Sequence, residues 1–164
     1  MEARNGLSTD RLFTKKGVCI TMIQVDTREV NNSHIISYFI HNDIPHIRSK
    51  MYVGDYCKYE NPKLVIERKA SILELAGNVG KEHMRFKDEL TRLDKVGGRM
   101  VMLIEETEPI ELWSHKRSQM NGIQISKILK SWESKHCFTV MQIKKADAGF
   151  KIAEILGYEL KENI

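Results

Sequence analysis

An uninterrupted apolar run at residues 100–104 places the strongest constraint on the fold of this chain. Runs of this kind are typical of a central strand that is covered on both faces of its sheet. Such a strand needs helices on each side, and amphipathic helical patterns lie before it at 82–96 and after it at 123–134. The run therefore predicts an α/β fold rather than an all-β or all-α fold.

Strand and helix patterns alternate along the rest of the chain. Further strands are expected at 18–25, 47–56, 64–68 and 137–143, and further helices at 31–41, 71–79 and from Asp147 to near Gly157. A polar turn containing Asn61 and Pro62 should join the strands 47–56 and 64–68. Strands separated by helices predict a three-layer α/β fold, with a central mixed β-sheet flanked by helices.

The 164 residues suffice for one compact domain, expected at 22–164, preceded by an N-terminal arm or extension at 1–21. No apolar run approaches the roughly 20 residues that span a bilayer, so no membrane partner is expected. The N-terminus lacks the pattern of a secretory signal, and three scattered cysteines do not form a disulfide framework. These features favour an intracellular protein of the cytoplasm, nucleoid or nucleus. The formal net charge of +4 permits nucleic-acid binding without predicting it.

Two short segments carry the most specific chemical signal. Gly54 and Asp55 lie near the end of one expected strand, and Glu67, Arg68 and Lys69 end the next. Because side chains two apart on a strand share a face, Glu67 and Lys69 should project together and Arg68 away from them. The hairpin connection should bring Asp55 beside this pair.

This arrangement suits the hydrolysis of a phosphodiester bond. The carboxylates of Asp55 and Glu67 are suitable ligands for Mg²⁺, which polarises a phosphate and lowers the pKa of a bound water. The Lys69 ammonium can orient that water or offset developing charge, and the backbone carbonyl of Arg68 can complete the metal shell. Either segment alone is more often a turn or a solvated strand end. The two together, in order and on adjacent strands, favour a metal-dependent nuclease.

A second charged group follows the first expected strand, at residues 26–29. Asp26 is a candidate for a further metal-binding carboxylate, directly or through water, and Arg28 can bind a phosphate with two nitrogens. Sites in open α/β sheets tend to lie outside the carboxyl ends of strands. The alternative is a helix N-terminal cap whose charges complement the helix dipole.

Two further regions contain candidate DNA contacts. In the expected helix 82–96, Arg85 and Glu89 lie on the face opposite the apolar stripe, where Arg85 can reach a phosphate. The alternative is a solvated face with an ion pair four residues apart. Lys116 and Arg117 are candidate phosphate contacts in a segment that fits a solvated loop better. Trp113 can stack on a base.

The last expected helix is apolar around more than one face. Its apolar residues are Phe150, Ile152, Ala153, Ile155, Leu156 and Tyr158. A one-sided contact with the core does not need this width. Two explanations stay open: a homodimer interface along this helix, or burial of the helix between other elements of the same chain.

These residues together resemble the nuclease domain of the XPF-type structure-specific endonucleases, within the PD-(D/E)XK restriction-endonuclease-like superfamily. The family pattern is G-D, a variable spacer and E-R-K, which residues 54–55 and 67–69 match in order and spacing. Residues 26–29 resemble the D-x-R-E of the family's first strand, Arg85 the arginine of the following helix, and residues 100–105 the central buried strand. The resemblance extends over about 22–158.

The resemblance implies a restriction-endonuclease-like fold and a Mg²⁺-dependent or Mn²⁺-dependent endonuclease. The implied substrate is branched, flap or fork DNA, cut near junctions of single-stranded and double-stranded DNA by a homodimer. Asp55 and Glu67 would be metal ligands and Lys69 the catalytic lysine. The supporting residues would be Asp26, Arg28, Glu29, Arg68, Glu74, Arg85 and Glu89.

The chain departs from the family pattern at several points. Leu73 stands where an acid is expected three residues after Lys69, and the neighbouring Glu74 also fits a capping box with Ser71. Glu89 replaces a glutamine. No residues are expected to form a helix-hairpin-helix domain, so a DNA-binding partner protein can be needed, and a stand-alone module would suit a phage or mobile element. The alternative function is a non-catalytic DNA-binding or scaffold subunit, against which the presence of Asp55, Glu67 and Lys69 argues.

Overall fold

The computed structural model describes residues 21–158, in which six strands form one mixed sheet with the order β2-β1-β3-β4-β5-β6. The strands are β1 Ile23–Val25, β2 His46–Arg48, β3 Tyr56–Lys58, β4 Asn61–Lys69, β5 Arg99–Ile104 and β6 Phe138–Gln142. Strand β3 is antiparallel to both of its neighbours, and all other pairs are parallel. The expected arm at 1–21, apart from its last residue, and the start of the expected strand 18–25 lie outside the described residues.

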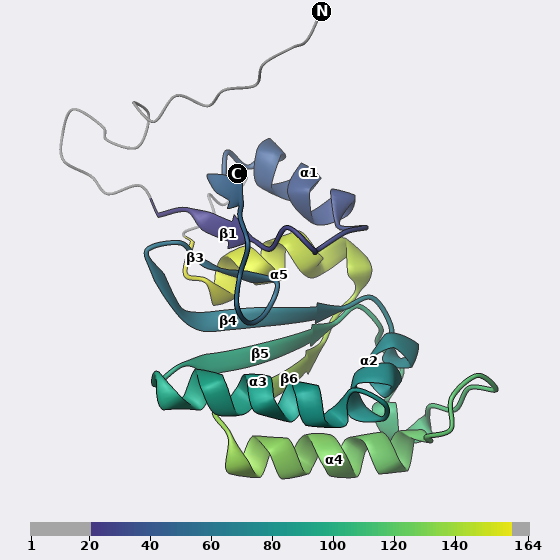
Figure 1. Cartoon of the computed structure of the whole chain (residues 1–164). Helices are drawn as coiled ribbons and strands as arrows, with labels where there is room; N and C mark the ends of the chain where they lie inside the picture. The colour runs from purple at the N-terminus through teal and green to yellow at the C-terminus, as the bar shows by residue number, and fades with distance from the viewer. Residues whose placement is uncertain (1–20, 159–164) are drawn as a thin grey trace, which may run out of the picture.

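Five α-helices cover the two faces of the sheet (Figure 1). They are α1 Ser33–His41, α2 Ile72–Val79, α3 His83–Lys95, α4 Gly122–Lys135 and α5 Ala148–Ile155, together with the short 3₁₀ helices η2 Ile110–Leu112 and η3 Lys145–Asp147. Helices α1 and α5 lie on one face, and α2, α3 and α4 lie on the other. The predicted three-layer α/β fold is confirmed. No helix within residues 21–158 is long and apolar enough to cross a membrane.

Strand β5 is buried on both faces, as its apolar run predicts. Met100, Met102 and Ile104 pack into the cluster beneath α2, α3 and α4. Val101 and Leu103 pack into the opposite cluster beneath α1 and α5. The central strand therefore separates two hydrophobic cores, and its C-terminal end holds Glu105 next to the end of β4.

The prediction of a single strand at 47–56 is wrong. The chain instead forms β2 and β3 on opposite sides of β1, and residues 49–55 cross between them as a loop. This crossing needs a sharp turn at Gly54, which has a φ of 73° and lies so close to β4 that an added Cβ would stand 3.0 Å from the Val65 Cβ. Asn61 and Pro62 belong to the start of β4 rather than to the turn, a position where a strand tolerates proline.

The broad apolar surface of α5 is mostly buried within the chain. Ile152 and Ala153 are fully buried against the sheet. Gly149 packs on α1 so closely that an added Cβ would stand 2.5 Å from the Tyr38 Cβ. Burial between α1 and the sheet therefore explains most of the apolar width, and Phe150 stays 40% exposed.

Two glycines give opposite expectations for stability. In Gly122→Ala, the new Cβ would stand 1.7 Å from the backbone oxygen of Ile110, so we expect destabilisation of at least about 1–3 kcal/mol from overpacking. Gly77 lies inside α2 with nothing within 4 Å of an added Cβ, so Gly77→Ala should stabilise by about 0.5–1 kcal/mol. Urea unfolding of both variants measures the difference, and equal effects would contradict the packing of η2 on α4.

Candidate active site

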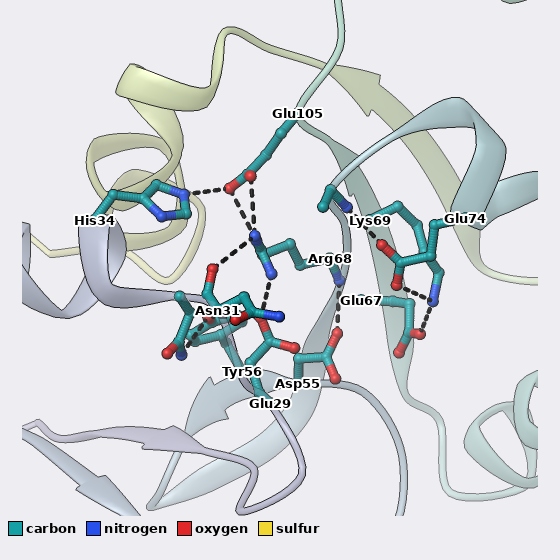
Figure 2. A network of polar contacts seen from close by, with 12 residues as sticks. Glu29, Asn31, His34, Asp55, Tyr56, Glu67, Arg68, Lys69, Glu74 and Glu105 are labelled. Carbon is teal, nitrogen blue, oxygen red and sulfur yellow. Dashed lines mark hydrogen bonds and ion pairs between the residues drawn. The ribbon is translucent and has the colours of Figure 1, made fainter.

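Three carboxylates lie side by side where β1, β3 and β4 meet. The backbone N–H of Asp26 donates to the Asp55 carbonyl at 2.9 Å, and the N–H of Asp55 donates to the Ile66 carbonyl at 2.8 Å. Glu67 follows Ile66 on β4. The β3–β4 hairpin thus brings Asp55 beside Glu67, as the sequence predicts, and Figure 2 shows both carboxylates close to Lys69.

Glu67 and Lys69 form an ion pair on one face of β4, with 2.6 Å between the Lys69 Nζ and the Glu67 Oε1. Lys69 is buried, with only 6% of its side chain exposed. Burial lowers the pKa of this ammonium, but the charge of Glu67 and the hydrogen bond to it more than offset burial, so the pKa lies above its ordinary value. Lys69 is therefore a fixed positive charge beside the carboxylates.

Asp55 is held from one side and left open on the other. Its Oδ2 accepts a hydrogen bond from the Arg68 backbone N–H at 2.8 Å. Burial, followed by the charges of Glu67 and Glu29, holds the pKa of Asp55 well above its usual range. Burial and the charge of Glu67 likewise raise the pKa of Glu89, which faces the site from α3. This crowding of negative charge would be relieved by a bound cation.

The residues present fit a divalent cation held largely by water and substrate. Within residues 21–158, no three His, Cys, Asp or Glu side chains form a preassembled metal site. Mg²⁺, however, commonly binds through one or two carboxylates and keeps several waters. Asp55 and Glu67 supply two such carboxylates, each with one oxygen that accepts the hydrogen bonds described above and a second oxygen available to a ligand. The donor set is therefore suited to a hard cation.

Arg68 projects to the opposite face of β4 from Glu67 and Lys69, as predicted, and is buried in an ion-pair network (Figure 2). Its Nη1 lies 2.6 Å from Glu29 Oε1, and its Nε lies 2.8 Å from Glu105 Oε1. Burial lowers the pKa of this guanidinium, but the hydrogen bond to Glu105 and the charge of Glu29 raise it overall. Because Arg68 follows Glu67 on β4 and its backbone N–H also holds Asp55, the network positions both carboxylates.

Sequence reasoning missed two members of this network. Glu105 accepts two hydrogen bonds from Arg68 and a 2.6 Å contact from His34 Nε2 at the start of α1. Burial raises the pKa of Glu105, but the bonds from Arg68 and His34 lower it overall. The position of Glu105, directly after the apolar run of β5, is a signal that could have identified it. The pairing of His34 with Glu105 leaves no such local signal.

Both carboxylate oxygens of Asp26 accept hydrogen bonds, from Arg28 and from the backbone of Met51. Oδ1 accepts from the Arg28 backbone N–H at 2.7 Å and from the Arg28 Nε at 2.8 Å, and Oδ2 accepts from the Met51 N–H at 2.6 Å. Burial raises the pKa of Asp26, but these bonds lower it below its ordinary value. Asp26 thus anchors Arg28 and the loop 49–55 beside the site, and its expected metal binding, directly or through water, stays a prediction.

Half of the capping box predicted at Ser71 and Glu74 forms, because the Glu74 side chain accepts from the N–H of Ala70 and not from that of the N-cap residue Ser71. Ser71 Oγ accepts from the Glu74 N–H at 3.2 Å, while Glu74 Oε2 accepts from the Ala70 N–H at 2.8 Å. Its other oxygen lies 4.0 Å from the Lys69 Nζ. Glu74 therefore caps α2 and adds negative charge near Lys69, and Leu73 packs against the core instead of facing the site.

The remaining candidates lie on α3 and in the segment between η2 and α4. Arg85 is exposed on α3 and pairs with Glu82. Lys116 and Arg117 are exposed in the segment between η2 and α4, where Arg117 lines a hollow with Gly77 of α2 and with Gly80, which follows that helix. Trp113 is only 5% exposed, which excludes the base stacking expected for it. Of these residues, Arg85 alone shares an element with Glu89.

Comparisons with known proteins agree with this architecture. The family model described as the ERCC4 domain matches residues 25–154. A solved structure of XPF from Aeropyrum pernix is similar with a TM-score of 0.61 and 16% identity over 82% of this chain and 63% of that chain. XPF from Aeropyrum pernix in complex with DNA is similar with a TM-score of 0.64 and 16% identity over 83% and 63%. This chain thus spans less than two thirds of those chains. Comparison with curated proteins found no match.

Proposed function

Because the chain belongs to the ERCC4 domain family of nucleases, we propose that it is a divalent-metal-dependent endonuclease that hydrolyses phosphodiester bonds in DNA. The observation that carries this proposal is the placement of Asp55, Glu67 and Lys69 on adjacent strands, with Lys69 fixed at 2.6 Å from Glu67. A scaffold subunit would not need to keep two carboxylates and a buried ammonium together beside β3 and β4.

Asp55 and Glu67 would hold Mg²⁺ or Mn²⁺, which supplies charge for a scissile phosphate and acidifies a bound water. Lys69 would hold a phosphate oxygen or the attacking water through its Nζ, since its pKa keeps it protonated. Asp26 and Arg68 would position these groups through the backbone and the loop 49–55. Arg28, which is 65% exposed, would bind a flanking phosphate.

We extend the proposal to the substrate, as branched, flap or fork DNA with a junction of single and double strands. The structure of a similar protein in complex with DNA supports a DNA substrate. Arg28, Arg85, Lys116 and Arg117 are exposed cations that would contact phosphates of the bound DNA. A DNA-binding partner protein would reinforce the preference for junctions.

Cleavage of labelled flap, fork, splayed and linear DNAs tests this function. We expect cutting of the branched DNAs with Mg²⁺ or Mn²⁺, no cutting in EDTA, and recovery when Mg²⁺ is restored, because the carboxylates need a cation to bind the phosphate. Gel analysis of the products measures this. A protein that binds these DNAs but cuts none of them with either metal is a scaffold, and the proposed function is then wrong.

Homodimerisation is a separate part of the proposal, and Phe150 is its test site. This side chain stays 40% exposed on α5, where most apolar neighbours are buried within the chain. If α5 forms the interface, Phe150→Asp should convert the dimer to a monomer in light scattering, while Glu154→Lys on the same exposed surface changes charge without removing a large apolar side chain. An unchanged mass for Phe150→Asp removes α5 from the interface.

A further inference from the structure

A groove of about 630 Å³ lies next to the candidate active site on the same face of the sheet. Its floor consists of residues from three neighbouring strands, Gln24, Cys57 and Val65. Gln24 is the register partner of Cys57, and Cys57 is the register partner of Val65. The groove therefore crosses β1, β3 and β4 in a straight row.

The candidate carboxylates form the next row on that face. Each lies two residues along the chain from one floor residue: Asp26 from Gln24, Asp55 from Cys57 and Glu67 from Val65. Residues two apart on a strand share a face and lie about 7 Å apart. The groove is thus a direct continuation of the site rather than a separate pocket.

The walls of the groove suit an unpaired nucleic-acid strand. Helix α3 contributes Arg92 and Leu93 to one wall, and the loop 49–55 contributes Lys50 and Tyr52 to the other. Lys50 and Arg92 are the charged residues that line it, and both are exposed cations. Tyr52 is 94% exposed, so its ring is available to a ligand.

The loop that carries Tyr52 is tied to the carboxylate row. Met51 N–H donates to Asp26 Oδ2 at 2.6 Å, and the Met51 carbonyl accepts from Arg28 Nη2 at 3.1 Å. On the other side, Gln24 Nε2 donates to Ser49 Oγ at 2.8 Å. Tyr52 therefore projects from a segment whose position is fixed relative to Asp26 and Asp55.

We infer that this groove binds an unpaired DNA strand next to the phosphate that is cut, with a base stacked on Tyr52 and backbone phosphates on Lys50 and Arg92. An aromatic ring stacks on the face of a base only when that face is not covered by neighbouring bases of a duplex. The two cations would neutralise the phosphates on either side. The inference rests on the proposed nuclease function and specifies which part of the substrate this face accepts.

Fluorescence anisotropy with a labelled oligo-dT 12-mer and a labelled blunt-ended DNA duplex, both in EDTA, tests the inference without any cutting. Tyr52→Ala should weaken binding of the 12-mer at least about five-fold, the lower end for loss of one stacked base. Tyr52→Phe keeps the ring and should bind like the wild type. The affinity for the fully paired duplex should change less than two-fold in Tyr52→Ala, because stacking on Tyr52 is confined to unpaired bases.

Arg92→Ala tests the phosphate contact, with Lys87→Ala as its charge-matched control on an exposed position of α3 outside the groove. Loss of one phosphate contact should reduce the slope of log affinity against log salt by about 0.7 for a single strand. Lys87→Ala should leave that slope unchanged.

The outcomes separate this inference from the proposed function. If the wild type cuts DNA and Tyr52→Ala binds the 12-mer as tightly as the wild type, the inference about the groove is wrong and the proposed nuclease function stands. Equal weakening of the 12-mer and the duplex assigns the groove to duplex DNA, which overturns the inference. No binding of the 12-mer by the wild type leaves the groove without its ligand and also overturns it. If Tyr52→Ala selectively loses affinity for the 12-mer and the wild type cuts nothing, binding of unpaired DNA in the groove is supported and the nuclease proposal fails.

Discussion

Glu67→Gln is expected to lower the rate of DNA cleavage by about 10²–10³-fold while the protein stays folded. The substitution removes one of the two carboxylate charges that we propose hold the metal ion, and loss of a single charge-stabilising group in a preorganised site commonly costs about 10²–10³-fold. It also removes the anionic partner of Lys69, which lies 2.6 Å away. Glutamine keeps the shape and a carbonyl oxygen that still accepts a hydrogen bond from Lys69, so the packing should persist.

The matched control for this prediction is Glu74→Gln. Glu74 lies 4.0 Å from the same Lys69 Nζ, but 49% of its side chain is exposed and it caps α2. Its replacement removes an equal charge from the same neighbourhood outside the Asp55–Glu67 pair, so cleavage should fall by less than about ten-fold. Single-turnover cleavage with Mg²⁺ compares the two variants. A Glu67→Gln protein that cuts as fast as the wild type would place the active site elsewhere.

Arg68→Met is expected to destabilise the protein by about 3–5 kcal/mol, the usual cost of removing one partner from a buried ion pair. The Arg68 side chain is 5% exposed and stands between Glu29 and Glu105, whose side chains are 11% and 0% exposed. Methionine fills a similar volume, so the loss comes mainly from two carboxylates left buried without their cation. Urea unfolding followed by circular dichroism measures this loss.

Arg85→Met is the control for Arg68→Met. Arg85 pairs with Glu82 on α3, and the side chains of this pair are 63% and 45% exposed. Exposed ion pairs contribute about 0–1 kcal/mol, so this variant should stay close to the wild type. Adding Glu29→Gln and Glu105→Gln to Arg68→Met should recover part of the lost stability, because it removes the unpaired charges. Equal stability of Arg68→Met and Arg85→Met would show that the network contributes little to folding.

Local patterns in the sequence were sufficient for most of the helices and strands and for the pair of Glu67 and Lys69 on β4. The apolar run of β5 predicts burial on both faces because a strand alternates its side chains regardless of its neighbours. The same alternation predicts that Glu67 and Lys69 share a face and that Arg68 points away, and both are observed. The capping of α2 by Ser71 and Glu74 is equally local.

Other features depend on which strands become neighbours, and sequence periodicity does not specify this. The expected strand 47–56 is two strands because β1 inserts between β2 and β3 in the sheet. The broad apolar surface of α5 lies against α1, which is far away in the chain. The Asp26 carboxylate accepts hydrogen bonds from Arg28 and from Met51 of the loop 49–55. The spacing of charges along the sequence does not reveal that this loop lies beside Asp26.

The sequence by itself therefore determined the three-layer α/β class and the grouping of Asp55, Glu67 and Lys69 on one hairpin, since spacing two along a strand and a short turn are properties of neighbouring residues. Only the tertiary structure decided that Arg68 is held by Glu105 and that Glu105 meets His34, contacts 37 and 71 residues apart along the chain. It also placed Tyr52 beside the carboxylate row. Contacts over such separations follow from strand order and helix placement, which are set by how whole faces pack together.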